Sequence, residues 1–166
     1  MMNSEARNMT KSAELPSWCD SSPPMHWQYS LLPRKNDLLL DPIDLSTNVA
    51  IIVGRKAPAA DIILDHQSIS RQHACLFYGK SGSLFIMCLG SSHGTVLNAN
   101  VALVKGIAVL LTPGDVLSFG KSSKEYEVIK KERVYNDEQV NPKQSANSNN
   151  YNDNEINMAN TFYVGD

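Results

Sequence analysis

The sequence predicts an all-β sandwich of about eleven mostly antiparallel strands. Three observations carry this prediction. Short stretches rich in Val, Ile, Phe and Tyr recur along the middle of the chain, as is typical of strands. Gly, Pro, Asn, Ser and Asp separate these stretches and are typical of turns. No segment of 12 or more residues shows apolar side chains at helical spacing between capping residues.

The predicted strands follow one another at short intervals. They are expected at 27–32, 38–40, 49–53, 62–64, 73–78, 84–88, 95–97, 101–104, 109–111, 116–119 and 126–129. Turn residues separate them most clearly at 80–82, 98–100 and 113–115. Cys75 and Cys88 fall inside predicted strands, where a free cysteine behaves as a small buried hydrophobe.

Composition divides the chain into three parts. Residues 1–24 are polar, and residues 131–166 contain nine Asn and few aliphatic side chains, so both ends are expected to be disordered. Residues 25–130 form the predicted domain, which is large enough for one sandwich core.

Charge and apolar content exclude two classes of protein. The chain carries 15 basic and 17 acidic residues, which disfavours a nucleic-acid binder that must neutralise phosphates along a backbone. The domain has 10 basic and 8 acidic residues, whereas the tail has 3 and 6. The longest apolar runs, 49–53 and 108–111, are far below the roughly 20 residues of a membrane span, so no membrane partner is expected. The three cysteines are expected to be reduced thiols in a nuclear or cytosolic protein.

Four short blocks lie at predicted strand ends and in loops. They are Gly54-Arg55, the run SISRQHA at 68–74, the run GSSHGT at 90–95, and PGD at 113–115 followed by Phe119-Gly120. Each block alone is common. Their order and spacing are specific, because Ser70 follows Arg55 by 15 residues and Gly94 follows His73 by 21 residues.

In these blocks the chain resembles the forkhead-associated (FHA) domain, a β-sandwich family that binds phosphothreonine. The resemblance covers about residues 27–130 and includes the family's main motifs in order. It is closest to a nuclear subgroup that includes the nuclear inhibitor of protein phosphatase 1, the SMAD nuclear-interacting protein and kanadaptin. The residues behind that choice lie at 16–18, 60–68, 92–95 and 119–126. The resemblance implies an FHA-type sandwich for residues 25–130.

The resemblance implies that Arg55, Ser70 and Arg71 hold the phosphate. A phosphothreonine carries about −1.5 to −2 charges and three acceptor oxygens near neutral pH. A guanidinium matches these oxygens and keeps its proton, and a serine hydroxyl adds a short donor. Structural alternatives stay open: Arg55 lying over the sheet, Ser70 capping a turn, and Arg71 as a solvated charge.

The resemblance places Ser92 and His93 in the loop that grips the peptide main chain, and Asn98 where it would stiffen that loop or shape the specificity pocket. Most family members have Asn where this chain has His93. A neutral imidazole keeps one donor and one acceptor, but they lie farther apart and respond to pH. We therefore expect binding to be retained, with an altered preference beyond the phosphothreonine.

Gly54, His73 and Gly94 are expected to support the site without touching the ligand. The two glycines suit tight turns or close backbone approaches. His73 starts a predicted strand three residues after Ser70, which favours a buried hydrogen-bonding post for the loop.

Catalysis is not expected. Residues 90–94 spell G-x-S-x-G, but that nucleophile motif needs a helix after it, and the strand-like Thr95-Val96-Leu97 follows instead. The His and Cys residues lack the paired spacing of metal ligands. We expect no enzyme activity, no cofactor and no metal.

The resemblance thus implies a monomeric, non-catalytic adaptor in nuclear signalling or in pre-mRNA splicing and RNA processing. The implied partner is a phosphothreonine-containing protein, with Thr-Pro sites on splicing or mitotic factors. The nuclear location rests on the resemblance, and the cytoplasm stays open. Two alternatives remain: a phospho-independent scaffold that docks a splicing or mRNA-processing partner through a lateral face, and a regulatory subunit of protein phosphatase 1.

Overall fold

The computed structural model describes residues 14–134, and all the regular structure in this range is β-strand. The strands are β1 (Trp27–Lys35), β2 (Leu38–Leu39), β3 (Ile43–Asp44), β4 (Ala50–Gly54), β5 (Ile62–Ile63), β6 (Ala74–Tyr78), β7 (Leu84–Cys88), β8 (Thr95–Leu97), β9 (Val101–Ala102), β10 (Ala108–Leu111), β11 (Val116–Phe119) and β12 (Glu125–Glu132). The eleven predicted strands are all present, and the additional one is β3. Within the described range, no helix is long and apolar enough to cross a membrane.

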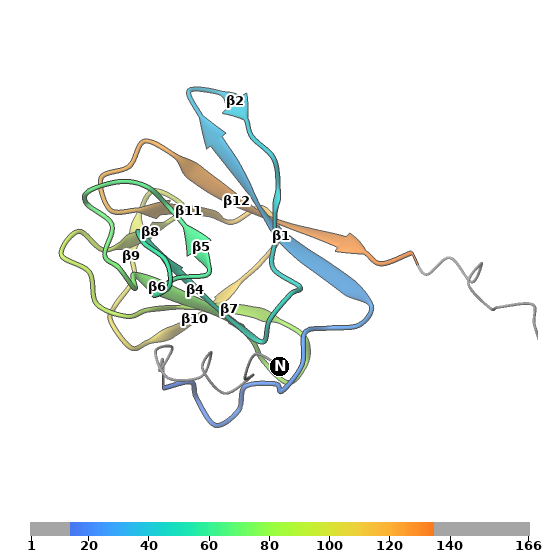
Figure 1. Ribbon diagram of the computed structural model, residues 1–166. Coiled ribbons are helices and arrows are strands. Elements are labelled where there is room, and N and C mark those ends of the chain that lie inside the picture. The colour runs from blue at the N-terminus through green and yellow to red at the C-terminus, as the bar shows by residue number, and fades with distance from the viewer. Residues whose placement is uncertain (1–13, 135–166) are drawn as a thin grey trace, which may run out of the picture. The chain divides into compact units, whose positions relative to one another are not determined.

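The larger sheet has seven strands in the order β2-β1-β12-β11-β8-β9, with β3 paired to β1 (Figure 1). Its pairs are antiparallel. The longest pair joins β1 to β12, with Trp27 opposite Glu132 and Arg34 opposite Glu125. The first and last of the described strands are therefore neighbours in this sheet.

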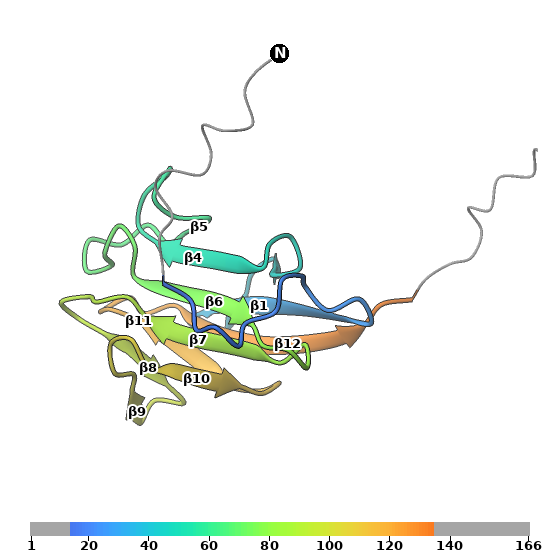
Figure 2. The same ribbon diagram turned by 90° about the horizontal axis from the view of Figure 1, so that it is seen from below.

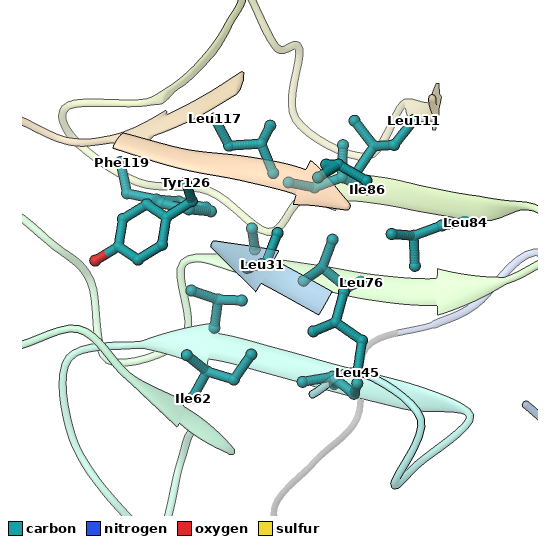
Figure 3. Close-up of a cluster of buried hydrophobic side chains, with 14 of the residues drawn as sticks. Leu31, Leu45, Ile62, Leu76, Leu84, Ile86, Leu111, Leu117, Phe119 and Tyr126 are labelled. Atoms are coloured by element: carbon teal, nitrogen blue, oxygen red, sulfur yellow. The ribbon is translucent and has the colours of Figure 1, made fainter. Parts of the chain in front are cut away.

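The second sheet has five strands in the order β10-β7-β6-β4-β5. Only its β4–β5 pair is parallel, with Val53 opposite Ile62. The main core lies between the two sheets, and Figure 3 shows Leu31 of β1, Leu76 of β6 and Leu117 of β11 within it. Burying each such leucine contributes about 1.5–3 kcal/mol. This core fixes the two sheets and, through them, the loops at their ends.

A segment that we call the N-terminal strap, residues 15–19, covers the outer face of the five-stranded sheet (Figure 2). The Trp18 ring packs edge-on against Phe85 with centroids 4.7 Å apart, and Cys19 forms a backbone bridge with Gly79. Every side chain of β6 is consequently buried, because the core covers one face of this strand and the strap covers the other. The cluster below the strap includes Cys75 and Phe77.

The strap differs from the disorder predicted for residues 1–24. Composition alone did not show that Leu15 and Trp18 find an apolar sheet face to cover. Strand β12 continues to Glu132, two residues past the predicted domain end at residue 130. The rest of both predicted disordered ends, residues 1–13 and 135–166, lies outside the described residues.

The cysteines are free thiols, as the sequence predicted, and Cys75 and Cys88 are buried. Burial raises the pKa of Cys75 to about 12, so this thiol stays protonated at neutral pH. A protonated, buried thiol is a poor nucleophile.

Candidate functional site

Three loops meet at one end of the sandwich, at the left of Figure 1. They are the β5–β6 loop (64–73), the β7–β8 loop (89–94) and the β11–β12 loop (120–124). The Gly120 N–H donates to the Gly94 carbonyl oxygen at 2.9 Å, and the Lys121 N–H donates to Ser68 Oγ at 2.7 Å. These bonds join segments far apart in sequence into one surface.

Arg55 leaves β4 directly after Gly54, beside the β5–β6 loop. Its N–H donates to the Ser70 carbonyl oxygen at 2.9 Å. Gly54 lies so close to the Arg71 backbone that a Cβ atom would collide with the Arg71 carbonyl oxygen. Only glycine permits this approach, which brings Arg55, Ser70 and Arg71 together.

These three residues line one surface pocket of about 460 Å³, together with Ala59 and Gln72. Both arginine side chains are exposed, and neither forms an ion pair with any residue between 14 and 134. The Gln72 side-chain amide donates to the Ala59 carbonyl oxygen at 3.2 Å and so braces the pocket wall. Two unpaired guanidinium groups around one hollow suit an anionic group.

His73 joins two of the loops from below. The fully buried ring accepts the Ser70 N–H at Nδ1 (3.2 Å) and donates from Nε2 to the Gly94 carbonyl oxygen (2.9 Å). These bonds define the neutral tautomer with its proton on Nε2. Burial lowers the pKa of His73 below its ordinary value, and the bond to Gly94 opposes this shift. The neutral ring thus sets the position of Ser70 relative to the β7–β8 loop.

Ser92 and His93 lie exposed in the β7–β8 loop. Neither side chain has a hydrogen-bond partner in the described part of the chain. The loop lies between two glycines in the left-handed region, Gly90 at φ 109° and Gly94 at φ 68°. His73 anchors its far end, so both exposed side chains lie on a loop that is tied to the pocket lined by Ser70.

Asn98 lies elsewhere, at the opposite end of β8 from Gly94. Its amide donates to Asp115 Oδ1 at 2.8 Å, and its Oδ1 accepts the Val116 N–H at 2.8 Å. Burial alone would raise the pKa of the Asp115 carboxyl. Hydrogen bonds from Asn98 and Thr112 outweigh this effect, so the pKa of Asp115 is lowered. Both the nitrogen and the oxygen of the amide thus hold this turn, at φ 51°, against the start of β11.

A second set of hydrogen bonds between loops involves residues to which the sequence analysis assigned no role. Ser68 Oγ donates to His66 Nδ1 at 2.8 Å and accepts the Lys121 N–H. A Cβ on Gly120 would meet Ser68 Oγ at 2.5 Å, so this glycine is needed for the contact. The sequence marked both 60–68 and Phe119-Gly120 as family blocks, but their contact spans 53 residues and is visible only in three dimensions.

The fold and the loop surface define a class of protein. Residues 51–120 match the FHA domain family, and the chain therefore contains an FHA domain. The predicted family and the predicted fold class are both confirmed.

Curated relatives share this domain. The protein phosphatase 1 regulatory inhibitor subunit PPP1R8 homolog of Arabidopsis thaliana is 44% identical over 98 residues, which cover 59% of this chain and 26% of that protein. The Smad nuclear-interacting protein 1 of Mus musculus is 35% identical, over 64% of this chain and 30% of that protein. The human nuclear inhibitor of protein phosphatase 1 is 31% identical, over 71% and 33%. The chain thus spans about a quarter to a third of the length of these relatives.

Solved structures share the fold. Full-length yeast Pml1p superposes with a TM-score of 0.62 and 23% identity, over 72% of this chain and 99% of that chain. The FHA domain of an Arabidopsis thaliana hypothetical protein gives a TM-score of 0.51 and 28% identity, over 70% and 93%. A second similar structure is that of the yeast Pml1 splicing factor, which was described together with its integration into the RES complex.

Proposed function

We propose that this FHA domain is a non-catalytic reader of phosphothreonine peptides. Arg55, Ser70 and Arg71 hold the phosphate, and Ser92 and His93 hold the peptide main chain on the β7–β8 loop. The observation that best supports this role is the pocket in which two unpaired arginines and Ser70 surround one hollow. Charge-assisted hydrogen bonds of this kind contribute about 1.5–3 kcal/mol each.

The other predicted site residues act through position. Gly54 lets Arg55 approach the Arg71 backbone, and His73 and Gly94 hold the two loops in register. Asn98 acts at a distance, because its amide is committed to Asp115 and the β11 backbone. Its role is to fix the turn after β8, which supports the loop before β8.

The cellular setting is proposed from the relatives. Their names include a nuclear inhibitor of protein phosphatase 1 and a Smad nuclear-interacting protein, and a structural neighbour is a splicing factor. We infer a nuclear adaptor that docks a phosphorylated splicing or mRNA-processing factor, with Thr-Pro sites as the expected epitopes. We propose that the domain comprises residues 25–130 and that its last strand, β12, continues to Glu132.

The test is calorimetric titration of the full chain with phosphothreonine, phosphoserine and unphosphorylated peptide pools. Selective binding of the phosphothreonine pool is expected. Arg55→Ala leaves the phosphate partly unpaired and should cost about 2–5 kcal/mol of binding. Lys80→Ala is the matched control, because this exposed cation lies in the β6–β7 turn at the other end of β6.

A loss well under 1 kcal/mol in Arg55→Ala would remove the phosphate assignment. Equal binding of phosphorylated and unphosphorylated pools would favour the phospho-independent scaffold instead. Equal losses in Arg55→Ala and Lys80→Ala would show a general charge effect without a defined site.

A further inference from the structure

We propose that the peptide site has a second anion-binding position, in which Lys105 and the β7–β8 loop take a further negative group of the same peptide. This group is a carboxylate or a second phosphate. The inference rests on the proposed phosphothreonine site and names the substrate class more closely: phosphothreonine peptides with an additional anion.

The backbone holds Lys105 at the root of the β7–β8 loop. Lys105 lies between β9 and β10 and forms a parallel bridge with Cys88, the last residue of β7. The Gly106 N–H donates to the Cys88 carbonyl oxygen at 2.9 Å. The lysine is therefore fixed at its backbone beside the loop, although it is distant from the loop in sequence.

The side chain of Lys105 lies across Gly90. A Cβ on Gly90 would come within 3.1–3.2 Å of Lys105 Cδ, Cε and Nζ. This spacing is tighter than ordinary van der Waals contact, so the lysine occupies space that a larger residue at position 90 would take. The absent side chain thus lets an ammonium group rest on the loop that carries Ser92 and His93.

Two groups here lack partners. Lys105 forms no ion pair within residues 14–134, so its charge is uncompensated. Ser91 Oγ, on the residue after Gly90, is buried and has no hydrogen-bond partner. An unsatisfied buried hydroxyl is rare in native structures and calls for a physical explanation. An anion received at this loop offers acceptor oxygens to the exposed Lys105 ammonium group.

The second position is connected to the phosphate pocket. His73 bonds Gly94, at the end of this loop, and Ser70, in the pocket wall. Arg55, Arg71 and Lys105 are thus unpaired cations on mutually braced loops. Their shared sign matches one peptide with two negative groups and repels a peptide with a basic flank.

The test is fluorescence anisotropy with the full chain and a set of phosphothreonine peptides. Asp or phosphoserine replaces a neutral residue at each flanking position in turn. At low salt, at least one acidic position should strengthen binding by about 3–10-fold, and added salt should reduce this gain. Lys105→Gln should abolish the gain and leave the affinity for the neutral-flank peptide within about twofold. Lys80→Gln is the matched control and should keep the gain.

Each possible result of this experiment bears directly on the second anion-binding position. Wild-type protein without any acidic preference, or Lys105→Gln with the preference intact, overturns the second position while the phosphothreonine site stands. Failure of all peptides, neutral-flank peptides included, overturns the proposed function and this inference together. A gain from phosphoserine alone assigns the position to a second phosphate, whereas an equal gain from Asp assigns it to any anion. Thermal melting of Lys105→Gln should match wild type, since the side chain is exposed.

Discussion

At the scale of single residues, His73 matters most, because one neutral ring satisfies a donor and an acceptor on two different loops. A protonated ring could not accept the Ser70 N–H, so the arrangement depends on the low pKa of His73 that burial produces. The side chain touches no solvent, so its effect on a ligand passes through Ser70 and Gly94. We therefore regard it as a positioning residue.

His73→Ala should lower the free energy of unfolding by about 1–3 kcal/mol at neutral pH, because it leaves the Ser70 N–H without its partner and removes one of the two hydrogen bonds to the Gly94 carbonyl oxygen. Phosphothreonine affinity should fall with it. Calorimetry and urea unfolding measure the two effects. Unchanged stability with lost binding would contradict the structural role and make His73 a ligand.

The same residue predicts a pH dependence. In the unfolded chain the ring takes up a proton near pH 6.5. In the folded chain the pKa of His73 is lowered, so the ring takes up the proton only at a lower pH. The unfolded state therefore binds more protons in this window, and the stability contributed by His73 is lost as pH falls below about 6.5. The difference in unfolding free energy between wild type and His73→Ala should be smaller at about pH 5.5 than at about pH 7.5. If urea titrations at several pH values gave the same difference in unfolding free energy, they would contradict the lowered pKa of His73.

The family resemblance grouped the pocket residues, but it did not identify every interaction partner around them. Arg55, Ser70 and Arg71 were assigned to the phosphate through the family resemblance, and the structure places them on one pocket. The sequence could not show that the Asn98 amide is already used by Asp115, 17 residues away. Nor could it show that Lys105 reaches Gly90, because such contacts depend on how separate turns fold toward each other.

At the scale of elements, strand positions followed closely from the apolar pattern. β7, β8 and β11 have the predicted limits. β3 was missed, because the two residues Ile43 and Asp44 are too few to show an alternation. The strap was missed for a different reason: its order depends on Phe77 and Phe85, which lie about sixty residues further along the chain.

Trp18→Ala should loosen the strap. We expect a loss of about 1–3 kcal/mol in the free energy of unfolding and faster labelling of Cys75 by a thiol reagent, because Cys75 lies in the cluster below the strap. Trp27→Ala is the matched control. Trp27 is similarly exposed, at 39% against 38% for Trp18, but lies on β1 against Lys130. It should leave Cys75 labelling unchanged. Equal labelling in both variants and wild type would show that the strap does not protect this face.

At the scale of the whole molecule, burial is uneven across the two sheets. β6 is buried at every position and β4 at all but its first, whereas β2 and β9 are exposed two-residue strands at the sheet ends. Backbone hydrogen bonds open least where both faces are covered. The centre of the five-stranded sheet is therefore the most stable part of the described fold.

Hydrogen–deuterium exchange should show this order. Amides of β4 and β6 should exchange most slowly, and amides of β2 and β9 should exchange fastest. Addition of a phosphothreonine peptide should slow exchange in the β5–β6 and β7–β8 loops, since ligand binding stabilises the segments it contacts. Protection of β9 equal to that of β6 would contradict the expected order.

The pairing of β1 with β12 has a kinetic consequence. These strands supply the longest ladder of the larger sheet, yet Trp27 and Glu132 are about a hundred residues apart in sequence. Closing so long a loop carries an entropic cost before any ladder contact forms. A ribosome must also release β12 before β1 can find its neighbour. Until then the edge of β1 that pairs with β12 stays open. A domain of this topology therefore passes through synthesis with one edge of its first strand unpaired until its last strand has been made.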